Sequence, residues 1–445
     1  MNADRTGAWH PDRSWADPLI ILLALLALLA AGCSLRARQR NALRPSERAS
    51  LQGRLVEVAL AGPRLLTGGG ASPAWAQRGA ELVDPWDRAL LAVLKAEMDS
   101  PPEPPASWID RATPTGQAGR SYRAACLAAY AGALLPSRGE REEVHRRLGH
   151  GHAADLLEAR LRDREGGGDA LRTQSRKALG TRLAGLGFLG LVVLAFALGG
   201  SGVAVYLLAT RGKPLVQALP MWSLSGRAAT LVLLGWFLTF FLAGNLAALL
   251  LAPWPTLRWA AVPLGYLLHA TLGLGLLCRA EGITPRVLWR RVAPGQPGPE
   301  LAWGLAFLAL AVLLVIAVAM ASSLILKPDQ SPQRDLQELL RGLSGWGPSL
   351  TLFLAVAVLA PLWEETLFRG FLLPILARSG QAYRALLLSA LLFGAIHLQP
   401  AGLPTLCTLG FVLALAMRHT GSLRTPILVH ACWNGSLFLL MRAFA

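Results

Sequence analysis

The sequence predicts an all-α protein in which a polytopic bundle of membrane helices is joined to a small helical extramembrane domain. The chain has 445 residues, of which 53% are hydrophobic and 16% are charged, and this is too apolar for an ordinary soluble protein. Apolar segments long enough to cross a bilayer recur along it, since a crossing helix takes about 20 residues. A long polar region follows the first of these segments, and there we expect a helical domain outside the membrane.

Nine apolar segments are interpreted as helices in the membrane. One lies near the N-terminus, and the other eight form the expected bundle. Several later segments are short or interrupted, which indicates helices that end within the membrane and line a cavity. In chain order the segments are Pro18–Leu35, Ala184–Ala209, Ala229–Ala252, Leu257–Cys278, Leu301–Ile325, Pro348–Trp363, Tyr383–Leu398, Leu403–Met417 and Leu423–Phe444.

This pattern divides the chain into four parts. Residues 1–35 are a tail and a transmembrane helix or signal segment, and residues 36–183 are the extramembrane domain. Residues 184–347 supply membrane helices, and residues 348–445 carry the polar motifs. The sequence Ala30-Ala31-Gly32-Cys33 resembles a lipoprotein cleavage box, but Ala30 takes the place of the usual Leu and acidic residues precede it, so an uncleaved helix is favoured.

The extramembrane domain shows clear helix signals. Asp84-Pro85 is typical of a helix start, and apolar side chains follow it at helical spacing. Further amphipathic stretches are expected near Tyr122–Leu135 and Ala153–Leu161. A cluster of histidines could hold a metal ion, but a solvated helix end is the favoured interpretation because no Cys or carboxylate completes a known ligand spacing. These histidines are His145, His150 and His152. The five cysteines form no CxxC pair and indicate no disulfide framework.

The formal net charge of +16 comes almost entirely from arginine. No nucleic-acid-binding motif accompanies it, so we attribute it to loops that flank membrane helices and exclude a nucleic-acid partner. The short loops favour a cytoplasmic location for the end of the bundle that carries Glu364, whereas the arginines between Arg36 and Arg48 favour the opposite orientation for the first helix. The loop residues counted are Arg211, Lys213, Arg227, Arg279, Arg286, Arg290, Arg291, Arg369, Arg378, Arg384, Arg418 and Arg424.

The most informative polar residues are Glu364 and Glu365, which interrupt an apolar segment. Carboxylates at membrane depth are costly and usually functional. Two neighbouring carboxylates in a low dielectric cannot both ionise at low cost, so one of them is expected to accept a proton near neutral pH and to act as a general base. Arg369 lies four residues after Glu365, where it can hold that carboxylate charged and leave Glu364 to activate water. A structural ion-pair cluster is the competing interpretation.

Two later helices add further polar residues at four-residue spacing, Phe393 with His397 and His430 with Asn434. Each pair lies on one helix face. A single His or Asn in such a helix is more often a satisfied core residue or a contact between helices. Their combination with the glutamates favours a site in which His397 orients water or binds zinc, and in which His430 and Asn434 donate hydrogen bonds to an oxyanion.

These motifs resemble those of the CPBP family of intramembrane endopeptidases, which is also called the CaaX protease and bacteriocin-processing or Abi family. The resemblance rests on Glu364-Glu365-x-x-x-Arg369, Phe393-x-x-x-His397 and His430-x-x-x-Asn434, in that order. It covers roughly the last hundred residues and leaves residues 1–182 as an added module.

The resemblance implies a core of about eight spans around a conical cavity, with Glu364 as the base and His397 assisting it. His430 and Asn434 would stabilise the oxyanion, and Glu365, Arg369 and Phe393 would support the site. Members of the family are often described as metalloproteases, and zinc held by Glu364, His397 and His430 is one form that these residues fit. No other cofactor is expected.

The predicted function is hydrolysis of peptide bonds in a membrane-anchored protein or peptide, in protein maturation or C-terminal processing. The arginine bias favours a bacterial genome and hence the bacterial cytoplasmic membrane as the location. A proton-coupled transporter is an alternative, although its polar groups should then spread over both halves of the bundle. A catalytically inactive immunity or scaffold protein of the same fold is another. The substrate, the need for a metal and the oligomeric state are left open.

Overall fold

The computed structural model describes residues 20–29, 31–33, 51–67, 84–98, 104–149, 151–210, 219–294, 298–325, 340, 345–378 and 380–444. Regular structure in these ranges is entirely helical, as the sequence predicted. The chain separates into two compact units. Unit 2 comprises residues 41–192, and unit 1 comprises residues 193–443 together with the N-terminal residues 1–40.

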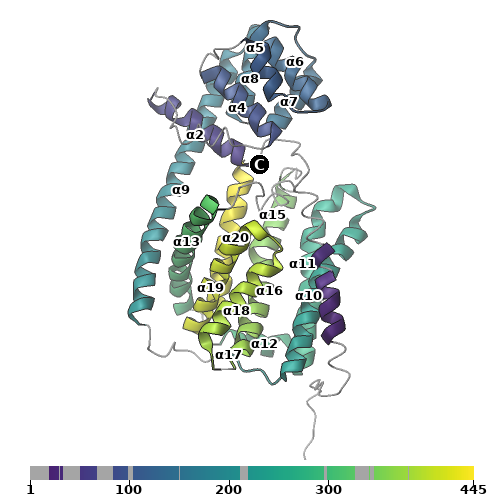
Figure 1. Cartoon of the computed structure of the whole chain (residues 1–445), viewed down its shortest axis with the longest axis vertical. Helices are drawn as coiled ribbons and strands as arrows, with labels where there is room; N and C mark the ends of the chain where they lie inside the picture. Colours follow the sequence, from purple (N-terminus) through teal and green to yellow (C-terminus); the bar gives the residue numbers. More distant parts are fainter. Residues whose placement is uncertain are drawn as a thin grey trace, which may run out of the picture. The chain divides into compact units, whose positions relative to one another are not determined.

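Unit 2 contains short helices that pack as a small bundle (Figure 1). Its core is formed by apolar faces that include Leu90, Leu94, Ile109 and Leu161. The predicted start at Asp84 is confirmed, because its carboxylate accepts a hydrogen bond from the Trp86 backbone N–H at 2.9 Å. The helices are α2 (Leu51–Thr67), α4 (Pro85–Met98), α5 (Pro105–Ala112), α6 (Gln117–Ala131), α7 (Arg138–Leu148), α8 (His152–Asp163) and the first part of α9 (Asp169–Ala209).

The amphipathic helices predicted in unit 2 are confirmed as α6 and α8. The first of them ends earlier than the predicted Leu135, at Ala131. Gly132 follows with a φ of 73°, a left-handed conformation that stops the helix and that glycine adopts at little cost.

Unit 1 is the membrane bundle. Six helices of the described chain are long and apolar enough to cross a membrane, which confirms a polytopic helical membrane protein. They are Asp169–Ala209, Gly226–Leu251, Ala261–Glu281, Pro299–Ser322, Trp346–Ala377 and Pro400–Thr420. The shorter Ala382–Ile396 is also apolar, and the C-terminal helix Arg424–Phe444 completes the set, so each of the eight segments expected after the polar region is helical.

In unit 1, α18 and α19 pack against each other, as do α10 and α11 (Figure 1). The second part of α9 opens the unit. After it come α10 (Gly226–Leu251), η1 (Pro255–Ala260), α11 (Ala261–Glu281), α12 (Pro285–Val292), α13 (Pro299–Ile325), α15 (Trp346–Leu354), η2 (Ala355–Leu359), α16 (Ala360–Glu365), η3 (Thr366–Leu372), α17 (Leu373–Ala377), α18 (Ala382–Ile396), η4 (Pro400–Gly402), α19 (Leu403–Thr420) and α20 (Arg424–Phe444).

The helix that carries the glutamate pair runs further than predicted. The sequence analysis ended this segment at Trp363, but helical backbone continues to Ala377. Two of the charged side chains that suggested an end, Glu365 and Arg369, are buried and paired with each other, so they do not need water. Arg369 was counted among loop arginines, and this was wrong, since its side chain is fully buried within the helix.

Two wide π-helical turns, η2 and η3, interrupt this helix, and each lies next to a proline. In η2 the N–H of Ala360 donates to Ala355, and Pro361 has no N–H, so neither can serve the carbonyl of Val356. The Asn434 amide from α20 donates to that carbonyl instead, at 3.1 Å. Such turns widen a helix and frequently mark functional sites.

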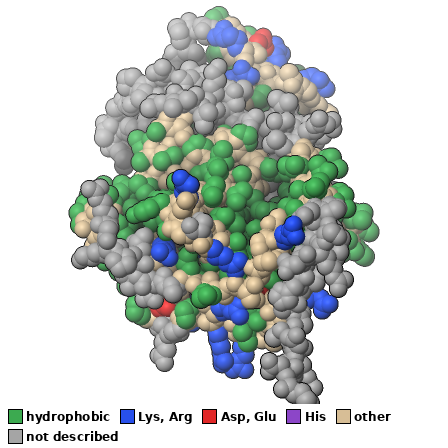
Figure 2. Space-filling view, turned by 60° about the horizontal axis from the view of Figure 1, so that its bottom comes forward, with side chains coloured by type: hydrophobic (Ala, Val, Ile, Leu, Met, Phe, Trp, Pro, Cys, Tyr) green, Lys and Arg blue, Asp and Glu red, His purple; other side chains and the backbone are tan. Residues whose placement is uncertain are grey.

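The end of unit 1 that carries α12 and α17 is basic. Figure 2, in which this end is turned toward the viewer, shows Lys and Arg side chains gathered over it. The exposed arginines of the loops and helix ends there are Arg227, Arg279, Arg286, Arg290, Arg378 and Arg384. Their clustering agrees with the loop arginines that favoured a cytoplasmic location, and the orientation itself stays a prediction.

The close packing of α18 on α19 gives a stability prediction. A Cβ at Gly410 would lie 3.0 Å from the Phe393 ring and 3.2 Å from the backbone of Ala390, so the two helices would have to separate. We expect Gly410→Ala to lower the free energy of unfolding by about 1–3 kcal/mol. Gly275→Ala is the matched control, because a Cβ there meets nothing within 4 Å. Unfolding in detergent measures both, and equal stability of the two variants would contradict the packing.

Candidate active site

The two neighbouring glutamates lie in different environments. They are consecutive on α16, so their side chains leave the helix about 100° apart. The Glu365 side chain is fully buried, whereas 18% of the Glu364 side chain is exposed. Glu364 is therefore the carboxylate that a water molecule or a substrate can reach.

Glu365 forms a buried ion pair with Arg369. The Nη1 of Arg369 donates to Oε1 of Glu365 at 2.8 Å, and Nη2 donates to the backbone carbonyl of Gly410 at 2.8 Å. The guanidinium carbon lies 4.5 Å from the centre of the Phe393 ring, a cation–π contact. The pair neutralises two charges that would be very costly alone in a low dielectric, and it fixes α16 and η3 to α19.

His430 bridges the two glutamates from α20. Its Nδ1 lies 2.8 Å from Oε1 of Glu365. Because Glu365 is paired with arginine and its carboxylate can only accept, Nδ1 carries a hydrogen, and in the neutral ring Nε2 has a lone pair. That Nε2 lies 3.9 Å from Oε2 of Glu364, a buried oxygen that accepts no hydrogen bond from the described part of the protein. One hydrogen-bonded molecule can contact two acceptors at this separation.

His397 directly follows α18 and lies next to the ring of Phe393. Its Nδ1 donates to the carbonyl of Phe393 at 2.7 Å. The Phe393 ring lies 5.0 Å from the His397 ring and 5.6 Å from the His430 ring. Leu398 follows in a left-handed conformation with a φ of 51°, which is uncommon for a residue with a side chain and turns the chain away from the helix.

The structure therefore brings most, but not all, of the predicted site residues into direct contact. Glu364, Glu365, Arg369 and His430 form one linked cluster, and His397 joins it through the ring of Phe393. Asn434 uses one amide hydrogen on the Val356 carbonyl and retains a second. Its predicted role at an oxyanion stays a prediction.

The sequence analysis missed the backbone groups of the site. The carbonyls of Val356 and Gly410 each accept a hydrogen bond from a predicted site residue, Asn434 and Arg369 respectively. Pro361 was the available signal, because a proline within a helix leaves carbonyls without their usual donor. No sequence feature of this kind indicated that the Gly410 carbonyl would accept a hydrogen bond from a site residue.

The predicted zinc ligands do not form a ligand set in this geometry. Among the residues that the structure describes, no three His, Cys, Asp or Glu side chains gather closely enough to hold a metal ion. His430 has only Nε2 to offer, since Nδ1 is engaged with Glu365. No catalytic step is derived through a metal, and the need for zinc stays a prediction.

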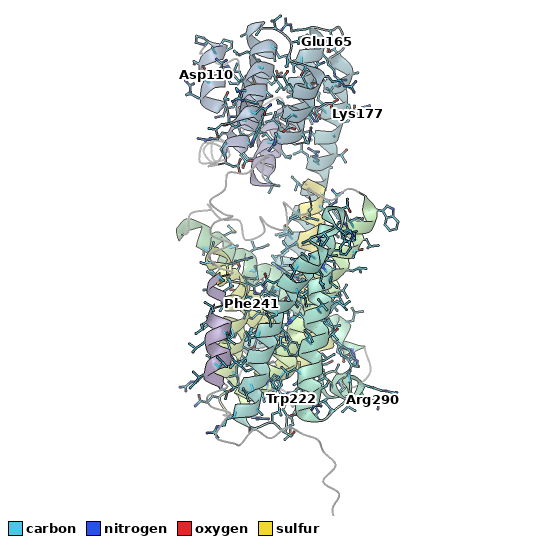
Figure 3. All side chains as sticks on the ribbon, turned by 90° about the vertical axis from the view of Figure 1, so that its right-hand side faces the viewer. Asp110, Glu165, Lys177, Trp222, Phe241 and Arg290 are labelled. Carbon is cyan, nitrogen blue, oxygen red and sulfur yellow. The ribbon has the colours of Figure 1, made fainter. Side chains whose placement is uncertain are left out.

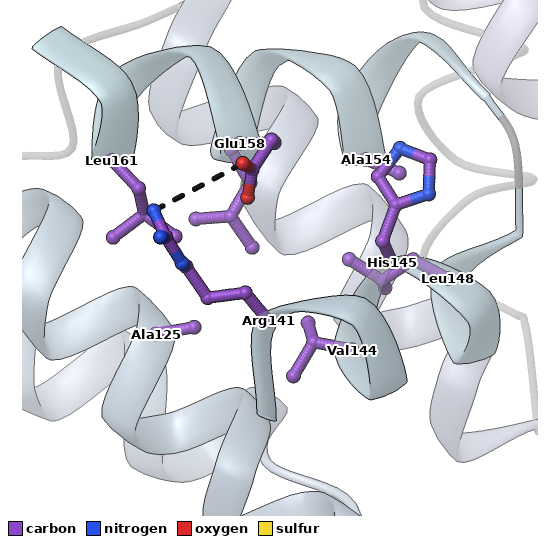
Figure 4. Close-up of a pocket in the computed structure, with 9 residues that line it drawn as sticks. Ala125, Arg141, Val144, His145, Leu148, Ala154, Glu158 and Leu161 are labelled. Carbon is purple, nitrogen blue, oxygen red and sulfur yellow. Dashed lines mark ion pairs between the residues drawn. The ribbon is translucent and has the colours of Figure 1, made fainter. Parts of the chain in front are cut away.

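The histidines of unit 2 form hydrogen bonds within their own domain. His145 contacts Asp155 at 3.1 Å, and His152 contacts Ser175 at 2.8 Å, while His150 lies outside the described residues. A small pocket near them is shown in Figure 4. Its lining is mostly apolar, and Arg141 and Glu158 lie 4.0 Å apart at its edge. These contacts favour a structural role for the cluster.

Comparison with known proteins supports the C-terminal motifs. Residues 346–436 match the family model described as type II CAAX prenyl endopeptidase, Rce1-like. This match confirms the resemblance to the CaaX protease family, and the matched residues contain all three motifs. An uncharacterized 24.3 kDa protein of Escherichia coli is 41% identical over 87 residues, which cover 18% of this chain and 39% of that protein. The chain thus spans well under half of that relative's length. No solved structure matches the chain.

Loss of the buried ion pair should strongly destabilise the bundle. We expect Arg369→Gln to lower the free energy of unfolding by about 3–5 kcal/mol, because it leaves Glu365 buried without a counter-charge. Arg424→Gln is the control, since its ion pair with Glu300 is partly exposed and should contribute less than about 1 kcal/mol. Denaturation in detergent compares the two variants, and equal losses would show that the buried pair is no more important than a surface pair.

The stability of unit 2 is expected to depend on pH through His152. Burial, the largest effect, lowers the pKa of this imidazole below its usual 6.5. The unfolded chain then binds a proton more readily, so stability is fully present above about pH 6.5 and is lost as pH falls toward the lower pKa of the folded state. Hydrogen exchange of unit 2 in the whole protein, between pH 7 and pH 5, measures this loss. His152→Gln should flatten the dependence, and an unchanged slope would refute the assignment.

Proposed function

We propose that this protein is an intramembrane endopeptidase that hydrolyses peptide bonds in a membrane-associated protein. The family match over residues 346–436 supports this class of reaction. The observation that carries the proposal is the position of the His430 ring, with Nδ1 bonded to buried Glu365 and Nε2 facing the accessible Glu364 at 3.9 Å. A general base and an oriented acceptor therefore share one small region of the bundle.

Glu365 and Arg369 have a positioning role in this proposal. Their mutual charge compensation keeps Glu365 ionised, and an ionised Glu365 holds the hydrogen of His430 on Nδ1. The lone pair of Nε2 then always points toward Glu364. Loss of either residue would release the histidine ring as well as weaken the fold.

Water is activated between Glu364 and His430. A water molecule that donates one hydrogen to Oε2 of Glu364 and the other to Nε2 of His430 has its oxygen lone pairs directed away from both. Glu364 takes a proton as the water oxygen forms a bond to the carbonyl carbon of the substrate amide. The same proton passes to the amide nitrogen as the C–N bond breaks, which yields a carboxylic acid and an amine and returns Glu364 to its starting state. The second proton of the water then passes from the carboxylic acid to the amine, so the products leave as a carboxylate and an ammonium group.

The remaining site residues are assigned by what their hydrogen bonds leave available. A neutral His430 with its hydrogen on Nδ1 has no second N–H, so we assign it to the water and not to the oxyanion. Asn434 keeps one amide hydrogen and is the proposed donor to the oxyanion. His397, whose ring lies 5.0 Å from that of Phe393, is proposed to assist Glu364, as the family resemblance implies.

The substrate is proposed to be a membrane-anchored protein or peptide that reaches the site from the bilayer, in the course of maturation or C-terminal processing. The site lies in helices that are long and apolar enough to span the membrane. The bacterial cytoplasmic membrane is the proposed location, because arginine strongly outnumbers lysine, as in GC-rich bacterial genomes.

Replacement of the base tests the proposal. We expect Glu364→Gln to reduce cleavage at least about 100-fold, because the amide cannot take a proton from water, while its nearly equal size keeps the fold intact. Quantitative proteomics of membranes from cells with the wild-type protein or the variant should show uncleaved proteins that accumulate only with the variant. Glu300→Gln, which alters a carboxylate away from the site, is the control.

Two results would contradict this assignment. Identical membrane proteomes for wild type and a folded Glu364→Gln variant would favour a scaffold of the same fold. Loss of pH-coupled uptake with no change in cleavage would favour a transporter.

A further inference from the structure

The carbonyl of Gly370, five residues after Glu365, accepts a hydrogen bond from a distant side chain. In a helix this carbonyl would accept from the residue four positions later, but that residue is Pro374, which has no N–H. The indole Nε1 of Trp222 donates to it instead, at 3.0 Å, in a buried hydrogen bond. Trp222 comes from the segment that precedes α10, far from Gly370 in sequence.

The Trp222 ring is held in place from several directions. It packs edge-on against Phe371 with a ring separation of 5.1 Å, and the guanidinium of Arg291 lies 5.2 Å from its centre. Only 6% of the residue is exposed. The ring therefore has little freedom to move without moving η3 with it.

The backbone at Trp222 and the two residues after it is fixed by polar side chains. Glu281, at the end of α11, accepts the N–H groups of Ser223 and Leu224 at 2.8 and 3.1 Å. Arg378, which follows α17, donates to the carbonyls of Trp222 and Leu224. Arg291 donates to Glu281 at 2.7 Å, which compensates the charge of that carboxylate.

This network lies at the basic end of unit 1. Figure 3 shows Trp222 near the end of the bundle at which Arg290 projects outward, while Phe241 lies further along the bundle. The same network connects α11, α12 and α17 with the segment before α10. The Trp222 bond is the point at which it contacts the wide turn η3.

We propose that Trp222 is a positioning residue for the active site, acting through the Gly370 carbonyl to fix the position of η3. Gly370 directly follows Arg369, whose guanidinium sets Glu365 and, through it, His430. If the indole donor is lost, the Gly370 carbonyl loses this partner and η3 is no longer held to the segment before α10, so Arg369 shifts with it. The catalytic consequence of this inference rests on the proposed function, whereas its conformational consequence does not.

The first test removes the donor and keeps the ring. Trp222→Phe should preserve the aromatic contact with Phe371 and lose the hydrogen bond. Hydrogen exchange of the purified protein in detergent should then speed up about tenfold in peptides that cover residues 366–377. Trp236→Phe is the matched control, because Trp236 is equally buried and its indole donates at 3.0 Å to His269, away from η3. It should leave exchange in residues 366–377 unchanged.

The second test restores a donor by another route. Pro374→Ala supplies an N–H four residues after Gly370 that can serve its carbonyl, so Trp222→Phe should speed up exchange much less in a Pro374→Ala background than in the wild type. Comparison within the Pro374→Ala background removes the general stabilisation that follows from loss of a helix proline, and a tryptophan that acts only through its ring predicts the same acceleration in both backgrounds. Equal exchange in wild type and Trp222→Phe, or the absence of rescue, would overturn the proposal.

The third test measures cleavage rates. Its substrate is a protein that accumulates uncleaved in cells with the Glu364→Gln variant. Trp222→Phe should lower kcat about tenfold with little change in KM, because the substrate contacts remain and the catalytic geometry is altered. Trp236→Phe should keep its kcat per folded molecule. If no cleaved protein is found, the proposed function fails while the exchange and rescue results still decide the role of Trp222. A changed KM with normal kcat would overturn the positioning role.

Discussion

The buried pair of Glu365 and Arg369 is the interaction on which the rest of the site depends. An ion pair exposed to water contributes little to the stability of a fold. Here both side chains are fully buried, and neither charge would be stable there without the other. The pair also orients the neighbouring groups, because Glu365 contacts His430 and Arg369 contacts the Gly410 carbonyl. A single ion pair thereby ties α16 and η3 to α19 and α20 and fixes the direction of one imidazole lone pair.

The prolines of the catalytic helix explain why distant segments must meet it. Each proline removes a backbone N–H, Pro361 the one five residues after Val356 and Pro374 the one four residues after Gly370. A carbonyl left unpaired in a membrane would be costly, and both carbonyls accept from a side chain elsewhere, Asn434 and Trp222. The prolines and these outside donors thus belong together.

Much of the fold and part of the site could be predicted from the sequence, because both leave local patterns. Apolar segments of spanning length predicted the bundle, and four-residue spacings predicted that Glu365 faces Arg369. The helix end predicted at Trp363 was wrong. Charged residues after an apolar segment usually indicate that a membrane helix has ended, and the sequence does not reveal when tertiary contacts neutralise those charges instead. Contacts across long sequence separations, such as Trp222 with Gly370, leave no periodic pattern and could not be found in this way.

A second buried histidine shows why polarity within a membrane does not by itself identify a catalytic group. Nε2 of His269 accepts from the Trp236 indole at 3.0 Å, and its Nδ1 contacts the Thr239 hydroxyl at 3.0 Å. Both ring nitrogens are therefore used, and the ring serves only to join α10 to α11. His430 differs in one respect. Only its Nδ1 forms a hydrogen bond, with Glu365, and its Nε2 faces the partly exposed carboxylate of Glu364. The chemical capacity of the site thus depends on the hydrogen bonds that its residues leave unmade, a property that residue identity cannot reveal.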